Sequence, residues 1–190
     1  MLLLPSHLLK DKGPTLGSRP MIVVVAGVAG SGKTTVGLLL ARRLGWQFAD
    51  GDRFHPAANV AKMRAGLPLT DDDRKPWLAA INAWMDDIIA SGQSAVLACS
   101  ALKRKYRDDL VGHREQAVMV FLTITQAQDE ARLHARKGHF FHEPLLASQF
   151  AALEPPDPAE PRVYPIPTDD APPGQIVAEI IRKLRLQPVS

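Results

Sequence analysis

The sequence has little cysteine and no long apolar run. Cys99 is the one cysteine among 190 residues, so the chain can form no internal disulfide and no zinc site built on several cysteines. This usage predicts a cytoplasmic location, in a reducing compartment. No apolar stretch approaches the roughly 20 residues that a membrane-spanning helix needs. The start, residues 1–5, lacks the basic leading region of a signal peptide, so a membrane partner is not expected.

The chain also lacks a block of charge of one sign. Its 23 basic and 20 acidic residues leave a net charge of only +3, and the basic residues are scattered. This balance gives no argument for binding to nucleic acid or to a membrane surface. The length of 190 residues suits one α/β domain with a real core better than two domains.

The first 20 residues lack the periodicity of a helix or a strand. Residues 10–20 combine two glycines and two prolines with polar residues, which is typical of a disordered lead-in. Met21 directly precedes the first apolar run, so the translation start can be Met1 or Met21. We therefore expect a lead-in over residues 1–20 and a single folded domain over residues 21–190.

What the chain does have is a phosphate-binding loop. Residues 27–34 match the pattern G-x-x-x-x-G-K-[ST] at every fixed position, directly after an apolar run and at the start of a helical pattern. The residues expected to bind ATP are Gly27, Val28, Ala29, Gly30, Ser31, Gly32, Lys33, Thr34 and Thr35. A glycine-rich turn that merely joins a strand to a helix is the alternative interpretation.

The residue types of this loop suit a phosphate chain. Glycines let backbone N–H groups approach a phosphate closely, and the helix N-terminus adds its own donors and dipole. Lys33 is expected to reach the β- and γ-phosphates, and the hydroxyl of Thr34 to hold Mg²⁺. The motif predicts a nucleotide-binding protein.

Apolar runs and helical patterns alternate along the rest of the chain. Strands are predicted at residues 22–26, at 47–52, where the second strand ends in the Asp-Gly-Asp motif, at 95–99, at 118–122 and, at the end, at 162–167. Helices are predicted after the phosphate loop, from Pro56 to Gly66, from Pro76 to about Ser91, and over 103–110, 125–136, 145–153 and 176–184. This alternation predicts an α/β fold with a mostly parallel sheet covered by helices on both faces. Two prolines place the last strand at a sheet edge, if it forms at all.

The carboxyl ends of parallel strands meet at one edge of a sheet, where ligands bind. This rule brings the phosphate loop together with residues 50–52 and 99–103. Asp52 is predicted to be the base that deprotonates an acceptor hydroxyl, and Asp50 to contact Mg²⁺ through water. Alternatively, both carboxylates simply cap the helix that follows.

The phosphate loop does not by itself choose among nucleotide-binding classes. The Asn-Lys-x-Asp stretch of guanine readers is absent, and the strand at 95–99 runs into Ser100 rather than the acidic residue of a switch or motor ATPase. A small-molecule kinase remains. Such an enzyme needs cations around the transferring phosphoryl group and a lid. Arg132 and Arg136 share a predicted helix face in a lid at about residues 132–150, unless they are only a solvated basic face.

Several other side chains are weaker candidates. His139 and His142 lie three residues apart but have no third ligand at a suitable spacing, so no metal site is predicted there. Trp77 and Trp84, seven residues apart, are predicted to be core or dimer contacts. Cys99 is predicted to be a buried strand residue rather than a nucleophile.

Further motifs give the chain a family resemblance. They are Asp-Gly-Asp at 50–52 with His-Pro at 55–56, Gly-Leu-Pro-Leu at 66–69, Asp-Asp-Asp-Arg-Lys-Pro-Trp-Leu at 71–78, Cys-Ser-Ala-Leu-Lys at 99–103, Arg-Lys-Gly-His-Phe-Phe at 136–141 and Ser-Gln-Phe at 148–150. With the phosphate loop, and in this order, they resemble the gluconokinase family over residues 22–154. The chain departs from that family in residues 1–20, at Ala29, where serine is more usual, and in the proline-rich stretch 155–173.

The resemblance implies a three-layer P-loop kinase fold with a five-stranded parallel sheet of order 2-3-1-4-5, and a homodimer. It also implies phosphorylation of D-gluconate at its 6-hydroxyl by ATP with Mg²⁺, a step of carbohydrate acid catabolism. The candidates to hold gluconate are Asp52, His55, Arg64, Arg74 and Lys103. Two alternatives stay open: the same fold acting on another acceptor, such as shikimate or a nucleoside monophosphate, and an ATP-binding regulatory module without turnover.

Overall fold

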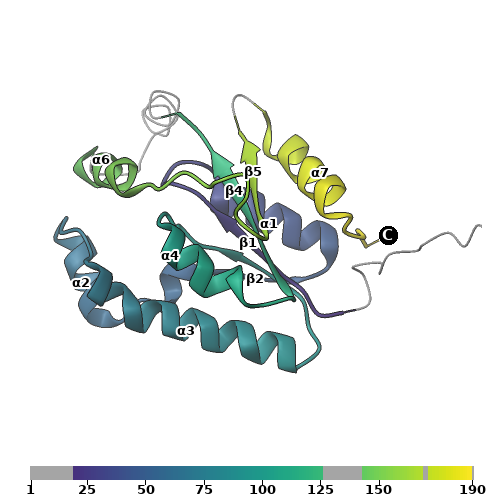
Figure 1. Cartoon of the computed structure of the whole chain (residues 1–190), viewed down its shortest axis with the longest axis horizontal. Helices are drawn as coiled ribbons and strands as arrows, with labels where there is room; N and C mark the ends of the chain where they lie inside the picture. The colour runs from purple at the N-terminus through teal and green to yellow at the C-terminus, as the bar shows by residue number, and fades with distance from the viewer. Residues whose placement is uncertain (1–18, 126–142, 169–170, 190) are drawn as a thin grey trace, which may run out of the picture.

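A computed structural model describes residues 19–125, 143–168 and 171–189, and its strands form one parallel sheet (Figure 1). The strands are β1 (Ile22–Ala26), β2 (Gln47–Asp50), β3 (Ala95–Ala98), β4 (Ala117–Thr123) and β5 (Val163–Pro167). Their order is β2-β3-β1-β4-β5, and every neighbouring pair is parallel. The predicted fold class and sheet order are confirmed.

Helices cover both faces of the sheet, as Figure 1 shows. The helices with described bounds are α1 (Lys33–Leu44), α2 (Ala57–Arg64), α3 (Asp71–Ala90), α4 (Arg104–Arg107), α6 (Glu143–Ala152) and α7 (Pro173–Leu184). A short 3₁₀ helix, η1 (Gly51–Phe54), follows β2, and a π-helical turn, η2 (Asp108–Gly112), continues α4. Within the described part of the chain, no helix is long and apolar enough to span a membrane.

The sheet separates two hydrophobic clusters, because successive side chains of a strand point to opposite faces. Val23 and Val25 of β1 pack in one cluster with Leu40 of α1, and α7 completes that layer. Val24 packs in the other cluster with Ile81 of α3. The whole of β1 is buried, so both layers close over the strand that carries the phosphate loop.

The edge strand β5 contains two prolines that the sheet tolerates. The backbone N–H of Thr168 donates to the carbonyl of Thr123, 3.0 Å away, so the even-numbered residues of this segment point their donors toward β4. Pro165 and Pro167 are odd-numbered, and their nitrogens therefore lie on the outer side, where none of the described strands pairs with β5. The predicted edge position of the last strand is confirmed.

Helix α3 begins earlier than the sequence prediction. A start at Pro76 was expected because proline is tolerated in a first turn, but the helix begins at Asp71 and Pro76 lies inside it. Thr70 and Asp73 form a capping box, in which each side chain accepts from the backbone N–H of the other residue. Three acidic residues in the first turn also suit the positive end of the helix dipole. The capping box and the favourable interaction with the helix dipole set the start of α3 five residues before Pro76.

Two smaller predictions were also incomplete. The second strand does not run on through the acidic motif, because β2 ends at Asp50 and the chain turns into η1. The charged helix predicted over residues 103–110 is only one turn of α-helix and then widens into η2.

A buried ion pair joins the segment after α6 to α4. The guanidinium of Arg107 donates to both carboxylate oxygens of Glu160, at 2.7 and 2.9 Å, and both side chains are 1% exposed. The same guanidinium donates to the backbone carbonyls of Leu102 and Glu154. Because each of the three guanidinium nitrogens donates to a partner in this buried setting, the pair fixes where the chain returns from α6 to the sheet.

Some predictions fall outside the described residues. They concern the lead-in over residues 1–18, the helix expected over 125–136 with Arg132 and Arg136, and the histidines His139 and His142.

Candidate active site

A cavity of about 560 Å³ opens where the carboxyl ends of β1, β2 and β3 meet. Ala29, Lys33 and Thr34 line it from the phosphate loop, and Asp50 and Asp52 from the end of β2. Residues of α2, α3, α4 and α6 complete its wall. The volume is in the range of pockets for small ligands, so the predicted gathering of these residues at one edge is confirmed.

The phosphate loop begins at a position that only glycine suits. Gly27 has φ +142°, and a Cβ there would lie 2.7 Å from the carbonyl oxygen of Leu122. Gly32 caps α1 in the left-handed conformation with φ +95°. The Nζ of Lys33 donates to the carbonyl of Val28 at 2.8 Å, so the lysine is folded back over the loop that it serves.

Two side-chain oxygen groups lie together beside this loop. The hydroxyl of Thr34 donates to Oδ2 of Asp50 at 3.1 Å, although the two residues are 16 positions apart. A hydroxyl and a carboxylate are the ligand types that Mg²⁺ prefers, and this ion usually takes only one or two protein carboxylates and completes its shell with phosphates and water. Among the described residues, no group of three or more His, Cys, Asp or Glu side chains is arranged to hold a metal ion by itself.

Asp52 lies on η1, two residues beyond Asp50. Its backbone N–H donates to Oδ1 of Asp50 at 3.1 Å, so the capping role that the sequence left open belongs to Asp50 and serves η1 rather than α2. Asp52 is exposed to the cavity, and the nearby protein atoms partly desolvate its carboxylate. This desolvation, followed by the negative charge of Asp50, raises the pKa of Asp52, while Lys33 opposes the shift.

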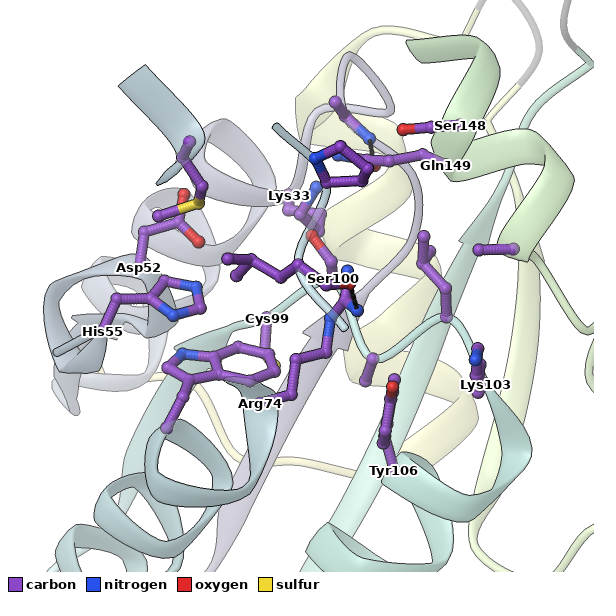
Figure 2. Close-up of a pocket in the computed structure, with 18 of the residues that line it drawn as sticks. Lys33, Asp52, His55, Arg74, Cys99, Ser100, Lys103, Tyr106, Ser148 and Gln149 are labelled. Atoms are coloured by element: carbon purple, nitrogen blue, oxygen red, sulfur yellow. Dashed lines mark hydrogen bonds between the residues drawn. The ribbon is translucent and has the colours of Figure 1, made fainter. Parts of the chain in front are cut away.

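His55 lies beside Asp52 in the cavity wall (Figure 2). Its ring stacks on Trp77 of α3, with ring centroids 4.6 Å apart. Desolvation, and then the positive charge of Arg74, lowers the pKa of His55 to about 4. The imidazole is therefore neutral at pH 7 and offers hydrogen bonds rather than a charge to a ligand.

The cationic side of the cavity lies opposite, as Figure 2 shows for Lys103 and Tyr106. The Nζ of Lys103 is 2.9 Å from Oδ1 of Asp71, which also accepts from the hydroxyl of Tyr106, and Oδ2 of Asp71 pairs with Lys105 at 2.5 Å. Hydrogen bonds from Lys105, Tyr106 and Lys103 hold the pKa of Asp71 well below its ordinary value. The charge of Lys103 is thus shared with a carboxylate of the protein.

Arg74 differs from Lys103 in its partners. It points from α3 into the cavity (Figure 2), and its guanidinium donates to the backbone carbonyls of Leu69 and Thr70. None of the ion pairs among the described residues includes it. Among the described residues, no carboxylate forms an ion pair with this positive charge, which faces the cavity.

Other predicted site residues lie elsewhere. Arg64 is exposed at the end of α2 and is not among the cavity-lining residues, although its neighbour Met63 is. Thr35 is exposed on the first turn of α1. Cys99 lines the cavity but is buried, and desolvation raises the pKa of its thiol to about 12, which agrees with the prediction that it is no nucleophile.

Two residues that line the cavity were assigned no functional role from the sequence. Ser148 and Gln149 of α6 line the cavity, and Oε1 of Gln149 accepts from the backbone N–H of Ala29 at 2.7 Å (Figure 2). The Ser-Gln-Phe motif at 148–150 was visible in the sequence, but a contact across 120 residues was not. Trp77 was expected only in the core or at a dimer contact, yet it also lines the cavity.

A phosphate loop, a nearby acid and an open acceptor cavity define the class of this protein. It is a P-loop kinase that acts on a small molecule. The family model for shikimate kinase matches residues 29–185, which agrees with this class.

More similar relatives identify the family. The chain is 44% identical to the gluconokinase of Gluconobacter oxydans (strain 621H) over 90% of its own length and 96% of that protein. It is 40% identical to the thermoresistant gluconokinase of Escherichia coli (strain K12), over 85% and 94% of the two chains. The crystal structure of a gluconokinase from Sinorhizobium meliloti 1021 matches with a TM-score of 0.77 and 42% identity, over 87% and 92%. The chain belongs to the gluconokinase family, within the P-loop kinases that resemble shikimate kinase.

The contact between Gln149 and Ala29 leads to a prediction about nucleotide binding. Gln149→Glu places a carboxylate of the same shape against the backbone of the phosphate loop. This carboxylate and the phosphates of ATP are both negative, and two such charges about 4 Å apart near a protein surface repel by a few kcal/mol. We expect the Kd for ATP to rise roughly tenfold or more, measured by titration with a fluorescent nucleotide. Gln149→Ala is the matched control, because it removes the contact without adding charge. Equal affinities for the two variants would contradict the prediction.

Proposed function

We propose that this chain transfers the γ-phosphoryl group of ATP to the 6-hydroxyl of D-gluconate and releases 6-phospho-D-gluconate. Family membership supports the reaction, because the relatives named above are gluconokinases. One observation in the cavity carries the proposal further. Asp52 lies at the end with the phosphate loop, and Arg74 reaches in from α3 with no carboxylate partner among the described residues.

This arrangement matches a molecule with an alcohol at one end and a carboxylate at the other. Gluconate is such a molecule, and its carboxylate would pair with the guanidinium of Arg74 through charge-assisted hydrogen bonds. Lys103 and Tyr106, already tied to Asp71, add polar groups at the same wall. His55, being neutral, is suited to the hydroxyls along the chain. Arg64 is left out of the proposed gluconate site, because it does not line the cavity.

The proposed transfer is in line. Asp52 accepts the proton of the 6-hydroxyl as the oxygen attacks the γ-phosphorus, and the bond from that phosphorus to the β-phosphate oxygen breaks. The raised pKa of Asp52 makes it a better proton acceptor than an ordinary carboxylate. Lys33 turns from the carbonyl of Val28 toward the phosphates and offsets their negative charge.

Thr34 and Asp50 are the proposed protein ligands for Mg²⁺. Their 3.1 Å contact brings a hydroxyl and a carboxylate together at the start of α1, which supports this assignment. When bound, the ion would draw negative charge from the phosphate oxygens of ATP. The protein's own contribution is to keep these two oxygens together beside the loop.

The remaining assignments extend the same proposal. Residues 21–190 form the kinase domain, with a lid at about 132–150 in which Arg132 and Arg136 neutralise the transferring phosphoryl group. The resemblance to gluconokinases supports a homodimer, and the single, buried Cys99 supports a location in the reducing cytoplasm.

The acceptor is tested by measuring ADP release with a coupled assay. ATP and Mg²⁺ are supplied with D-gluconate, shikimate or a nucleoside monophosphate, and without any acceptor. We expect ADP release only with gluconate, because only it offers both a primary alcohol for Asp52 and a carboxylate for Arg74. Turnover with shikimate alone would assign the chain to another acceptor, and turnover without an acceptor would contradict the kinase reaction.

Two arginines provide a matched test of the carboxylate site. Arg74→Ala removes a charged hydrogen-bonding partner from the cavity and should raise the KM for gluconate roughly 10- to 100-fold, with the KM for ATP nearly unchanged. Arg64→Ala removes the same charge from outside the cavity and should leave both constants unchanged. If Arg64→Ala had the larger effect in steady-state kinetics, the proposed orientation of gluconate would be wrong.

Asp52→Asn tests the proposed base. The amide keeps the shape of the side chain but cannot accept the proton, so kcat should fall by roughly 10² to 10⁴. Binding of nucleotide, followed by the same fluorescence titration, should stay near the wild-type value, which separates loss of chemistry from loss of the site. Near-normal turnover would remove Asp52 from the base role.

A further inference from the structure

Trp77 contacts both ends of the turn that carries Asp52. Its indole Nε1–H donates to the carbonyl oxygen of Gly51 at 2.8 Å, and the tryptophan is only 3% exposed. Its ring stacks on His55, with an interplanar angle of 11°. Gly51 precedes Asp52 and His55 follows three residues later, so one side chain of α3 spans the segment that presents the proposed base.

The glycine end of the turn has little room to move. A Cβ on Gly51 would lie 2.8 Å from the carbonyl oxygen of Ala98, so the turn is packed tightly against the end of β3. On the other side, Oδ1 of Asp50 accepts from the backbone N–H of Asp52. The hydrogen bond from Trp77 adds a third restraint, directed at the peptide group that connects Gly51 to Asp52.

The histidine end is tied to the same helix. Nδ1 of His55 lies 3.4 Å from Nδ2 of Asn59, and this amide also donates to the backbone carbonyl of Asp73 at 2.7 Å. Asn59 is buried, so these polar groups depend on one another rather than on water. The turn, α2 and α3 are thereby held as one unit around Trp77.

We propose that Trp77 is a positioning residue for phosphoryl transfer, whose indole N–H fixes the Gly51 carbonyl and so directs the carboxylate of Asp52 at the acceptor hydroxyl. This inference rests on the proposed function of Asp52. The ring of Trp77 and its indole N–H have different parts in this proposal. The ring fills space in the core, as phenylalanine also can, whereas only the N–H restrains the turn.

Trp84 supplies an internal comparison. It lies two turns further along α3, and its ring packs on Phe54 of the same turn, with centroids 5.7 Å apart. It contacts the turn through its ring, and no hydrogen bond from its indole occurs within the described residues. Trp77→Phe and Trp84→Phe therefore make the same chemical change on one helix, but only the first removes a donor to the Asp52 turn.

The test compares steady-state kinetics of Trp77→Phe and Trp84→Phe with gluconate and ATP. We expect kcat of Trp77→Phe to fall roughly 10- to 100-fold, the loss that an ångström-scale misplacement of a catalytic group produces, while the KM for ATP stays near the wild-type value. Trp84→Phe should keep its kcat within about threefold. If Trp77→Phe does not fold, replacement of Trp77 by 3-benzothienylalanine keeps the shape of the indole without its N–H.

Three outcomes overturn the proposal: an unchanged kcat, an equal loss of kcat in both variants, or a rise in the KM for gluconate alone, which would make Trp77 only a contact of the acceptor. Amide hydrogen exchange at Gly51–Phe54 gives a readout that needs no acceptor. It should accelerate in Trp77→Phe and not in Trp84→Phe. If the wild type leaves gluconate unmodified, the proposed function fails, and this exchange measurement still decides whether Trp77 restrains the turn.

Discussion

The central position of β1 is the constraint on which the site depends. Ladders hold this strand on both sides, with Ile22 opposite Ala95 of β3 and opposite Ala117 of β4. The chain therefore leaves the sheet at Gly27 between the ends of two neighbouring strands, where the Leu122 carbonyl leaves no room for a side chain. Because the strands are parallel, β2 and β3 deliver their own carboxyl ends to the same edge. The order of the strands thus decides which side chains can reach a phosphate.

The cations at the cavity differ in whether a carboxylate neutralises them, and helix α3 accounts for much of this difference. The carboxylate of Asp71, the first residue of α3, forms ion pairs with Lys103 and Lys105 and accepts a hydrogen bond from the hydroxyl of Tyr106. The positive charges of these two lysines are therefore largely neutralised. One turn later, Arg74 donates to backbone carbonyls and keeps its charge directed at the cavity. Within the described part of the chain, Arg74 takes part in no ion pair, and a cation in this position suits a ligand group with one negative charge. The same helix therefore both holds the basic cluster in place and directs the guanidinium of Arg74 at the cavity.

Local patterns were enough to predict the parts of the fold that local physics determines. The phosphate loop combines an apolar run, glycines at fixed spacing and a helix start, and each of these signals lies within a few residues. The edge position of β5 followed from its prolines in the same way. The start of α3 was wrong because two local signals disagreed: the first-turn preference of Pro76 was given more weight than the capping box of Thr70 and Asp73, which the sequence also displays.

Contacts between distant residues set the limit of prediction at the site. The spacing of Trp77 on α3 correctly indicates a buried ring, because hydrophobic periodicity reports burial. The spacing cannot indicate the partner of the indole N–H, since that partner is a backbone carbonyl 26 residues away. Every residue has such a carbonyl, so the sequence does not distinguish the one that accepts. The contact of Gln149 with the backbone of Ala29 was hidden for the same reason. The residues that hold a catalytic group in place are therefore harder to find than the group itself, because they act through peptide groups that every residue shares.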